Sequence, residues 1–159
     1  MKRENAGSAS PKRAESIVVS ACLLGEACRY DGKSQPCDAV LSLVNIYELV
    51  PVCPEQLGGL PTPRTPSEVQ RDGRVVDRSG IDRTAEFELG ARETLALARE
   101  HNCTRAILKA KSPSCGTREI YDGSFSGTLI PGQGITARAL RTAGIALADE
   151  TNFESLLAK

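Results

Sequence analysis

Three short apolar runs, each typical of a buried β-strand, lead toward a cysteine. The cysteines that follow residues 17–21, 49–52 and 106–108 are Cys22, Cys53 and Cys115. In an open α/β sheet, the carboxyl ends of parallel strands face one crevice, and ligands bind there. The sequence therefore predicts that three thiols, far apart in the chain, meet at one edge of a sheet.

Segments with helical spacing separate these runs. The clearest covers residues 82–101, in which apolar side chains recur at Phe87, Ala91, Leu95 and Ala98 and charged residues lie on the opposite face. Strands that alternate with helices predict a single α/β domain with a mostly parallel, Rossmann-like sheet and helices on both faces. Further helices are expected at residues 37–46, 135–143 and 152–158, and a further strand at 145–147.

Two Asp-Gly pairs predict small β-hairpins outside this sheet. The first lies within residues 67–77, and the second joins residues 119–121 to 125–130. Between the second strand and the first hairpin, residues 54–64 are rich in Pro and Gly, so we expect a loop without regular structure there. A stiff loop directly after a strand is a typical place for a functional site.

Length and charge limit the classes of protein to consider. The chain has 159 residues, enough for one domain with a hydrophobic core, which we place at residues 17–159 after a disordered polar tail, residues 1–16. Its 20 basic and 20 acidic residues give no net charge. This balance argues against a protein whose main ligand is nucleic acid.

The cellular compartment follows from what precedes Cys22. Residues 19–22 resemble a lipoprotein cleavage box, but only residues 17–19 form an apolar stretch before it, far short of the roughly 7–15 residues of a signal core. No run of about 18 apolar residues occurs, so we expect no membrane-spanning segment. We therefore expect a cytoplasmic protein, in which six reduced cysteines indicate metal binding or catalysis rather than disulfides.

The types of ligand available favour one kind of metal centre. Cys37 and Cys103 fit the interpretation of small buried hydrophobic residues, and the single histidine, His101, ends a helix and fits a role at the helix dipole. There is no Cys-x-x-Cys pair, and a zinc site would need a fourth ligand such as Cys28. Iron–sulfur chemistry tolerates scattered, all-thiolate ligands, and three thiolates would leave one iron of a four-iron cluster open.

Polar residues beside two of these cysteines are candidates for catalysis. Glu55 follows Cys53 by two residues, and a carboxylate there could move protons. Residues 109–116 contain two lysines, which would lower the pKa of the thiol of Cys115, and two serines. Residues 132–137 fit the glycines of a dinucleotide fingerprint, but they follow a hairpin rather than a first βαβ unit, so they indicate only a helix start.

These segments together resemble a family long catalogued as a domain of unknown function and now represented by bacterial thiouracil desulfidases. The matching stretches are residues 19–25, 28–32, 51–64 and 109–116, the last with a Ser-Pro-Ser-Cys-Gly core. Gly127-Thr128 and Gly134-Ile135-Thr136 also fit. The resemblance covers about residues 17–150, and its second and third stretches are long enough to be specific.

The resemblance implies a [4Fe-4S] cluster whose fourth iron binds the sulfur of a thiolated nucleobase such as thiouracil. Carried over by motif, the cluster ligands are Cys22, Cys53 and Cys115. The catalytic residues implied in the same way are Glu55 and Ser112. The expected products are uracil and sulfide, formed by non-redox cleavage of the C–S bond.

Several points stay open at this stage. Arg29, Arg64 and Ser114 are candidate substrate contacts, and Cys28 is an alternative ligand. A desulfidase of thiolated tRNA bases is the alternative substrate class, although the neutral charge argues against it. A non-enzymatic iron–sulfur or zinc carrier, or a redox sensor, is the other alternative. The sequence indicates no oligomeric state.

Overall fold

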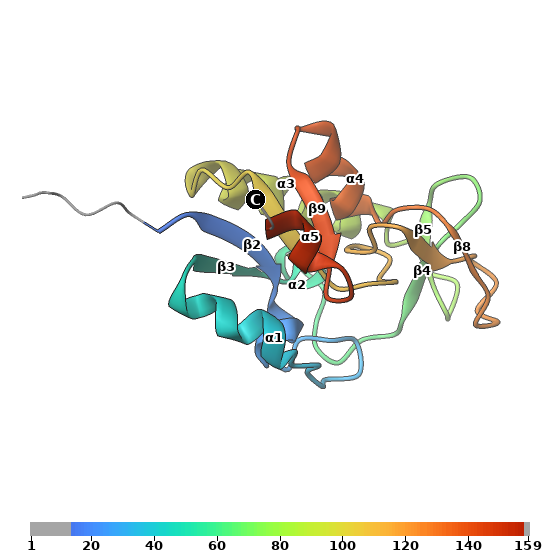
Figure 1. Ribbon diagram of the computed structural model, residues 1–159. Coiled ribbons are helices and arrows are strands. Elements are labelled where there is room, and N and C mark those ends of the chain that lie inside the picture. The colour runs from blue at the N-terminus through green and yellow to red at the C-terminus, as the bar shows by residue number, and fades with distance from the viewer. Residues whose placement is uncertain (1–13, 158–159) are drawn as a thin grey trace, which may run out of the picture.

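Four parallel strands form the sheet at the centre of the protein (Figure 1). The computed structural model describes residues 14–157, so most of the predicted tail lies outside the described residues. The strands, in their spatial order, are β3 (Glu48–Val52), β2 (Ser16–Ser20), β6 (Arg105–Leu108) and β9 (Ala146–Asp149). Every neighbouring pair is parallel, which confirms the predicted sheet.

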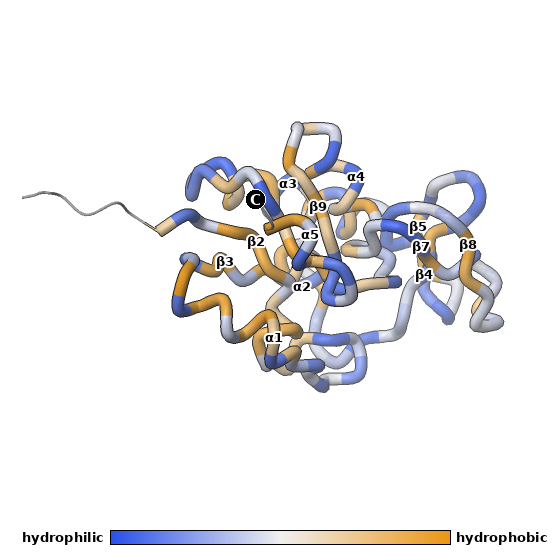
Figure 2. The backbone as a smooth tube through the Cα atoms, viewed as in Figure 1, coloured by the Kyte–Doolittle hydropathy of each residue, from blue (hydrophilic) through white to orange (hydrophobic). Residues whose placement is uncertain are grey.

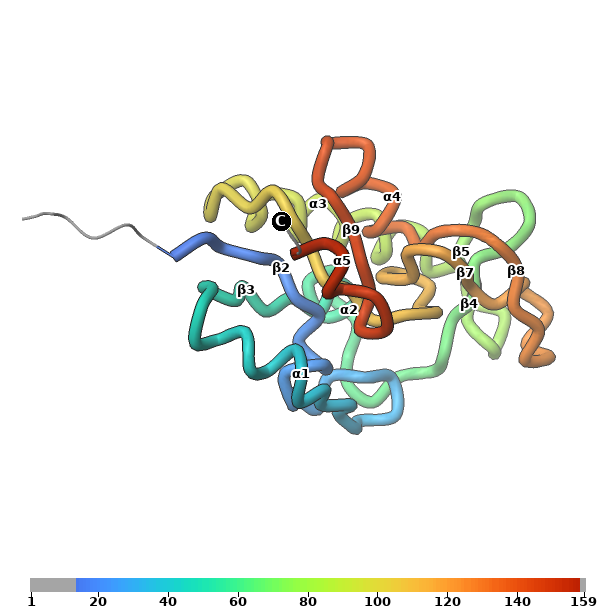
Figure 3. The backbone as a smooth tube through the Cα atoms, viewed as in Figure 1, coloured from blue at the N-terminus to red at the C-terminus, as the bar shows by residue number. Residues whose placement is uncertain are grey.

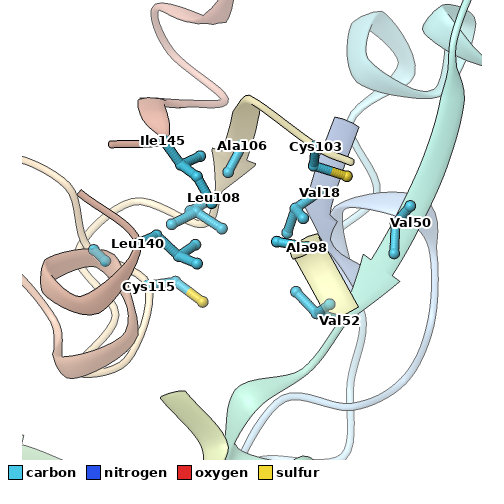
Figure 4. Close-up of a cluster of buried hydrophobic side chains, with 11 residues drawn as sticks. Val18, Val50, Val52, Ala98, Cys103, Ala106, Leu108, Cys115, Leu140 and Ile145 are labelled. Atoms are coloured by element: carbon cyan, nitrogen blue, oxygen red, sulfur yellow. The ribbon is translucent and has the colours of Figure 1, made fainter. Parts of the chain in front are cut away.

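Helices cover both faces of this sheet, as predicted. They are α1 (Asp38–Leu41), α2 (Pro54–Leu57), α3 (Thr84–Glu100), α4 (Ile135–Thr142) and α5 (Phe153–Leu157). Alternation along β2 separates the two layers: Val18 packs in a core with α3 and α4, whereas Ile17 and Val19 pack in a core with α1 and α5. Figure 4 shows part of the first core, with Leu108 and Leu140 beside Cys115.

Two hairpins form a separate lobe beyond the sheet (Figure 1). One pairs β4 (Ser67–Val69) with β5 (Val75–Asp77), and the other pairs β7 (Glu119–Tyr121) with β8 (Leu129–Pro131), both antiparallel as predicted. A third, smaller core that includes Val75, Phe87 and Ile120 joins this lobe to α3. Figure 2 shows that apolar residues gather along β2, β3 and α1, while the hairpin turns are polar.

Three predicted elements differ from the structure. Residues 54–57 form the single helical turn α2, because Pro54 stands at the first helical position, where its fixed φ and missing N–H are tolerated. The predicted helix at residues 37–46 is only α1, followed by a 3₁₀ turn, Ser42–Asn45. The first strand ends at Ser20, so Cys22 lies in a second 3₁₀ turn, Ala21–Leu24.

The turn α2 lies very close to α3. A Cβ atom on Gly58 would lie 1.9 Å from the carbonyl oxygen of Glu86, and one on Gly90 would lie 1.9 Å from that of Pro54. Only glycine at both positions permits this approach, which fixes α2 at the carboxyl end of β3. Within residues 14–157, no helix is long and apolar enough to cross a membrane.

Candidate metal centre and its surroundings

A cavity of about 520 Å³ lies where β2, β3 and β6 end, between the sheet and the hairpin lobe. Every residue assigned a site role from the sequence lines it: the three cysteines Cys22, Cys53 and Cys115, the candidate catalytic pair Glu55 and Ser112, and the candidate substrate contacts Arg29, Arg64 and Ser114. Their convergence follows from the parallel sheet, because each segment leaves the carboxyl end of a strand.

Four free thiols gather at the sheet side of this cavity. Cys22, Cys28 and Cys115 are buried, and Cys53 is half-buried. The thiol of Cys28 lies beside those of Cys22 and Cys53, close enough for each to shift its pKa. The Sγ atom of Cys53 also lies 3.6 Å from the carbonyl oxygen of Cys28. Cys28, left open as an alternative ligand, is therefore a direct neighbour of two of the predicted ligands.

These surroundings favour protonated thiols. The neighbouring thiol of Cys22 raises the pKa of Cys28 to about 11, and burial raises the pKa of Cys115 to about 11. The expectation that lysines lower the pKa of Cys115 is wrong. Lys109 is paired with Glu150 at 2.9 Å, and burial dominates at the thiol. Because thiolates bind metals, metal uptake here must displace protons.

Glu55 is held from both sides. Its Oε1 atom accepts a hydrogen bond of 2.8 Å from Nε of Arg64, and its Oε2 atom accepts one of 3.1 Å from Oγ of Ser114. The carboxylate projects from α2, two residues after Cys53, into the cavity lining. Its orientation is thus fixed before any ligand binds.

The guanidinium nitrogens of Arg64 all donate hydrogen bonds to other atoms of the protein. Besides Glu55, the guanidinium donates to the carbonyl oxygen of Cys28 at 2.9 Å, to that of Pro61 at 3.1 Å and to Oγ1 of Thr62 at 3.0 Å. Only 7% of its side chain is exposed. Arg64 therefore ties α2 to the loop that carries Cys28. Arg29, in contrast, is half-buried and forms a hydrogen bond with Gln35.

The serines form a compact turn before Cys115. Oγ of Ser112 accepts hydrogen bonds from the backbone N–H groups of Ser114 at 3.1 Å and Cys115 at 3.0 Å. It also lies 3.0 Å from Oγ of Ser114. Oγ of Ser114 in turn lies 3.7 Å from Sγ of Cys115. A chain of polar atoms thus connects Glu55 with both serines and the cysteine.

The start of α4, labelled in Figure 3, supports this turn through backbone hydrogen bonds. The N–H groups of Thr136 and Ala137 donate to the carbonyl oxygen of Ser114 at 2.9 and 3.0 Å, and that of Ile135 donates to Pro113 at 2.9 Å. A Cβ atom on Gly134 would lie 2.4 Å from the carbonyl carbon of Ser114. The glycines that resemble a nucleotide motif therefore allow α4 to approach the cysteine turn.

The hairpin lobe supplies the wall that was not predicted from the sequence. Glu68, Arg78, Tyr121 and Phe125 line the cavity from this side. Both hairpins were expected, but no short-range pattern indicates that their side chains face the carboxyl ends of the central strands. That arrangement depends on the third core, which is formed by residues distant in sequence.

The donor set fits an iron–sulfur cluster better than a single ion. Among residues 14–157, no three His, Cys, Asp or Glu side chains converge closely enough to hold one metal ion. Cysteines that bind a cluster attach to different iron atoms, so they need not converge on one point. His101 does not line the cavity and instead lies 3.9 Å from Glu48, so thiols are the soft donors that the cavity offers.

Comparisons with known proteins identify the family and the fold. A model of the 2-thiouracil desulfurase family matches residues 17–152. The uncharacterized protein YbbK of Bacillus subtilis (strain 168) is 41% identical over 150 residues, which cover 89% of this chain and 99% of that protein. The solved structure of the [4Fe-4S]-dependent thiouracil desulfidase TudS (DUF523Vcz) has a TM-score of 0.84 at 43% identity, over 90% of this chain and 95% of that one.

Proposed function

This chain belongs to the 2-thiouracil desulfurase family, and from that premise we propose that it is a [4Fe-4S]-dependent enzyme that removes sulfur from a thiolated pyrimidine base such as thiouracil. The observation that carries the proposal is the cavity that combines free thiols from three separate segments with Glu55 and Ser112. The products are uracil, for a thiouracil substrate, and sulfide.

We assign Cys22, Cys53 and Cys115 as the cluster ligands, because each follows a different strand of the sheet at the cavity. Cys28 is assigned as a neighbouring thiol, since it lies beside Cys22 and its carbonyl oxygen is 3.6 Å from Sγ of Cys53. When bound, a cluster with three protein ligands supplies an open, thiophilic iron that acts as a Lewis acid toward a thione sulfur.

The reaction is a hydrolysis without net oxidation or reduction. Water forms the new C–O bond at the ring carbon, the C–S bond breaks, and the sulfur leaves as sulfide. Glu55 accepts a proton of the attacking water and returns it to the departing sulfur, and its two hydrogen bonds, from Arg64 and Ser114, keep the carboxylate in place for this role. Ser112 orients the pyrimidine ring of the substrate or donates a proton to one of its ring atoms.

Ser114 connects these two groups, because its hydroxyl reaches both Oε2 of Glu55 and Oγ of Ser112. Arg64 acts on the substrate indirectly, through Glu55, since all three of its guanidinium nitrogens already donate to protein atoms. Arg29 is less constrained and remains our candidate for a direct contact with the base. The free thiols agree with a reducing, cytoplasmic location.

The test begins with anaerobic purification. The protein should be brown, with broad near-visible absorption, and should release sulfide from thiouracil. Cys22→Ser, Cys53→Ser or Cys115→Ser should bleach it, whereas Glu55→Gln should keep the colour and lose sulfide release. A colourless anaerobic protein with full zinc occupancy would instead support a carrier. Turnover of thiolated tRNA but not of thiouracil would show that the substrate is a thiolated base within RNA.

A further inference from the structure

Phe125 holds a backbone conformation that a bulky residue rarely adopts. Among residues 14–157, three residues other than glycine have positive φ: Asn102, Lys111 and Phe125. Asn102 follows the end of α3, where asparagine tolerates this geometry. Lys111 and Phe125, with φ of 71° and 57°, both line the cavity. Strained residues of this kind persist where the surrounding structure holds them, and they concentrate at functional sites.

Side chains of the β4–β5 hairpin and of the residue that follows it hold the turn that carries Phe125. Oε1 of Glu68 accepts hydrogen bonds from the N–H groups of Gly123 at 2.9 Å and Phe125 at 3.1 Å. Nε2 of Gln70 donates to the carbonyl oxygen of Gly123 at 3.2 Å. The guanidinium of Arg78 lies 5.4 Å from the centre of the Phe125 ring. One hairpin thus fixes both the backbone and the ring presented by the other.

Aromatic side chains are concentrated in this cavity. The chain has only three Phe and three Tyr, and Tyr30, Tyr121 and Phe125 line the cavity. Tyr30 is exposed, and Tyr121 lies within the regular strand β7. Only Phe125 combines a strained backbone with a set of residues that holds it there. A pyrimidine is a flat ring, and stacking on an aromatic side chain is a common way for proteins to bind one.

We propose that Phe125 is a specificity-determining residue that stacks on the planar ring of the thiolated substrate, at the wall of the cavity formed by the hairpin lobe. This inference rests on the proposed function, because it concerns the binding of the same substrate. In the alternative, Phe125 serves only to pack the two hairpins together. The two roles predict different effects when Phe125 is replaced by a residue that tolerates positive φ. Loss of stacking would weaken substrate binding, whereas loss of packing alone would lower stability.

Phe125→Asn separates these roles, because asparagine adopts positive φ readily and has no aromatic face. We expect its thermal unfolding midpoint to equal or exceed that of the wild type, its iron content to be unchanged, and its KM for thiouracil to rise about tenfold or more. Phe125→Leu keeps an apolar side chain and should also raise KM, whereas Phe125→Tyr should retain wild-type KM. Binding of thiouracil, measured by calorimetry on the cluster-loaded protein, should weaken in parallel.

Tyr47→Ala is the matched control. Tyr47 also lies beside an arginine, Arg105, at 5.5 Å, but it does not line the cavity. Its loss should lower the unfolding midpoint and leave KM unchanged. Wild-type KM in both Phe125→Asn and Phe125→Leu would overturn the stacking role while sulfide release by the wild type still stands. Binding of thiouracil that depends on Phe125, without sulfide release, would instead overturn the proposed function.

Discussion

The contact between α2 and α3 makes Gly90→Ala the sharpest test of the fold around the site. In the interior of a helix, Ala is normally more stable than Gly by about 1 kcal/mol. At Gly90, however, the new Cβ atom would lie 1.9 Å from the carbonyl oxygen of Pro54, whereas ordinary contact begins at 3.4 Å. The two helices must therefore separate by about 1.5 Å.

Overpacking of this kind costs about 1–3 kcal/mol, and the blocked atom is backbone that cannot rotate away. After the gain in helix propensity is subtracted, we expect Gly90→Ala to destabilise the protein by up to about 2 kcal/mol. For a chain of this length, that lowers the unfolding midpoint by up to about 8 °C. Because α2 carries Glu55, sulfide release should fall by more than stability alone explains.

Ala96→Gly, at an exposed position of the same helix, is the control. It should destabilise by about 1 kcal/mol through propensity alone and should leave sulfide release per folded molecule unchanged. Both variants can be followed by circular dichroism on heating, together with iron content. A Gly90→Ala protein more stable than the wild type would show that α2 and α3 do not approach each other this closely.

Three further changes test other contacts. Arg64→Ala leaves Glu55 without its charged partner, so we expect a loss of about 3 kcal/mol in the free energy of unfolding, measured with denaturant, and a smaller loss for Arg64→Lys. Equal stability of Arg64→Ala and the wild type would contradict this. Cys28→Ser should keep the iron content and visible absorption that Cys53→Ser loses; bleaching would make Cys28 a ligand. Burial raises the pKa of Asp149, but hydrogen bonds from Thr151 and the charge of Arg118 outweigh it and lower the pKa overall. Asp149 therefore stabilises the protein above the ordinary carboxyl pKa, about 3.9, and loses that effect as pH falls through its lowered value. Asp149→Asn should lower the unfolding midpoint at pH 7, with a difference that shrinks below pH 4; a constant difference would refute the assignment.

The central sheet was predictable because short apolar runs, of which the one in β2 is β-branched, mark its first three strands. Ile17, Val18 and Val19 alternate between the two cores, so the run must be covered on both faces. The meeting of Cys22, Cys53 and Cys115 then follows from topology alone.

Other features were not predictable because they depend on contacts between distant segments. The turn α2 forms in a stretch dominated by Pro and Gly, since Gly58 seats it against Gly90. The high pKa of Cys115 depends on burial and on a distant partner for Lys109, neither of which short-range sequence reveals. The position of Phe125 likewise depends on Glu68, which belongs to the other hairpin.

The support that α4 gives to the Ser112–Cys115 turn also bears on when the cofactor can enter. This helix begins about twenty residues after Cys115, and its first N–H groups hold the carbonyl oxygens beside that cysteine. On the ribosome, a nascent chain has two of its three assigned ligands long before it has the helix that positions the third. We therefore expect iron and sulfur to be inserted only when synthesis is nearly finished. A chain truncated before Ile135 should bind no cluster and remain colourless.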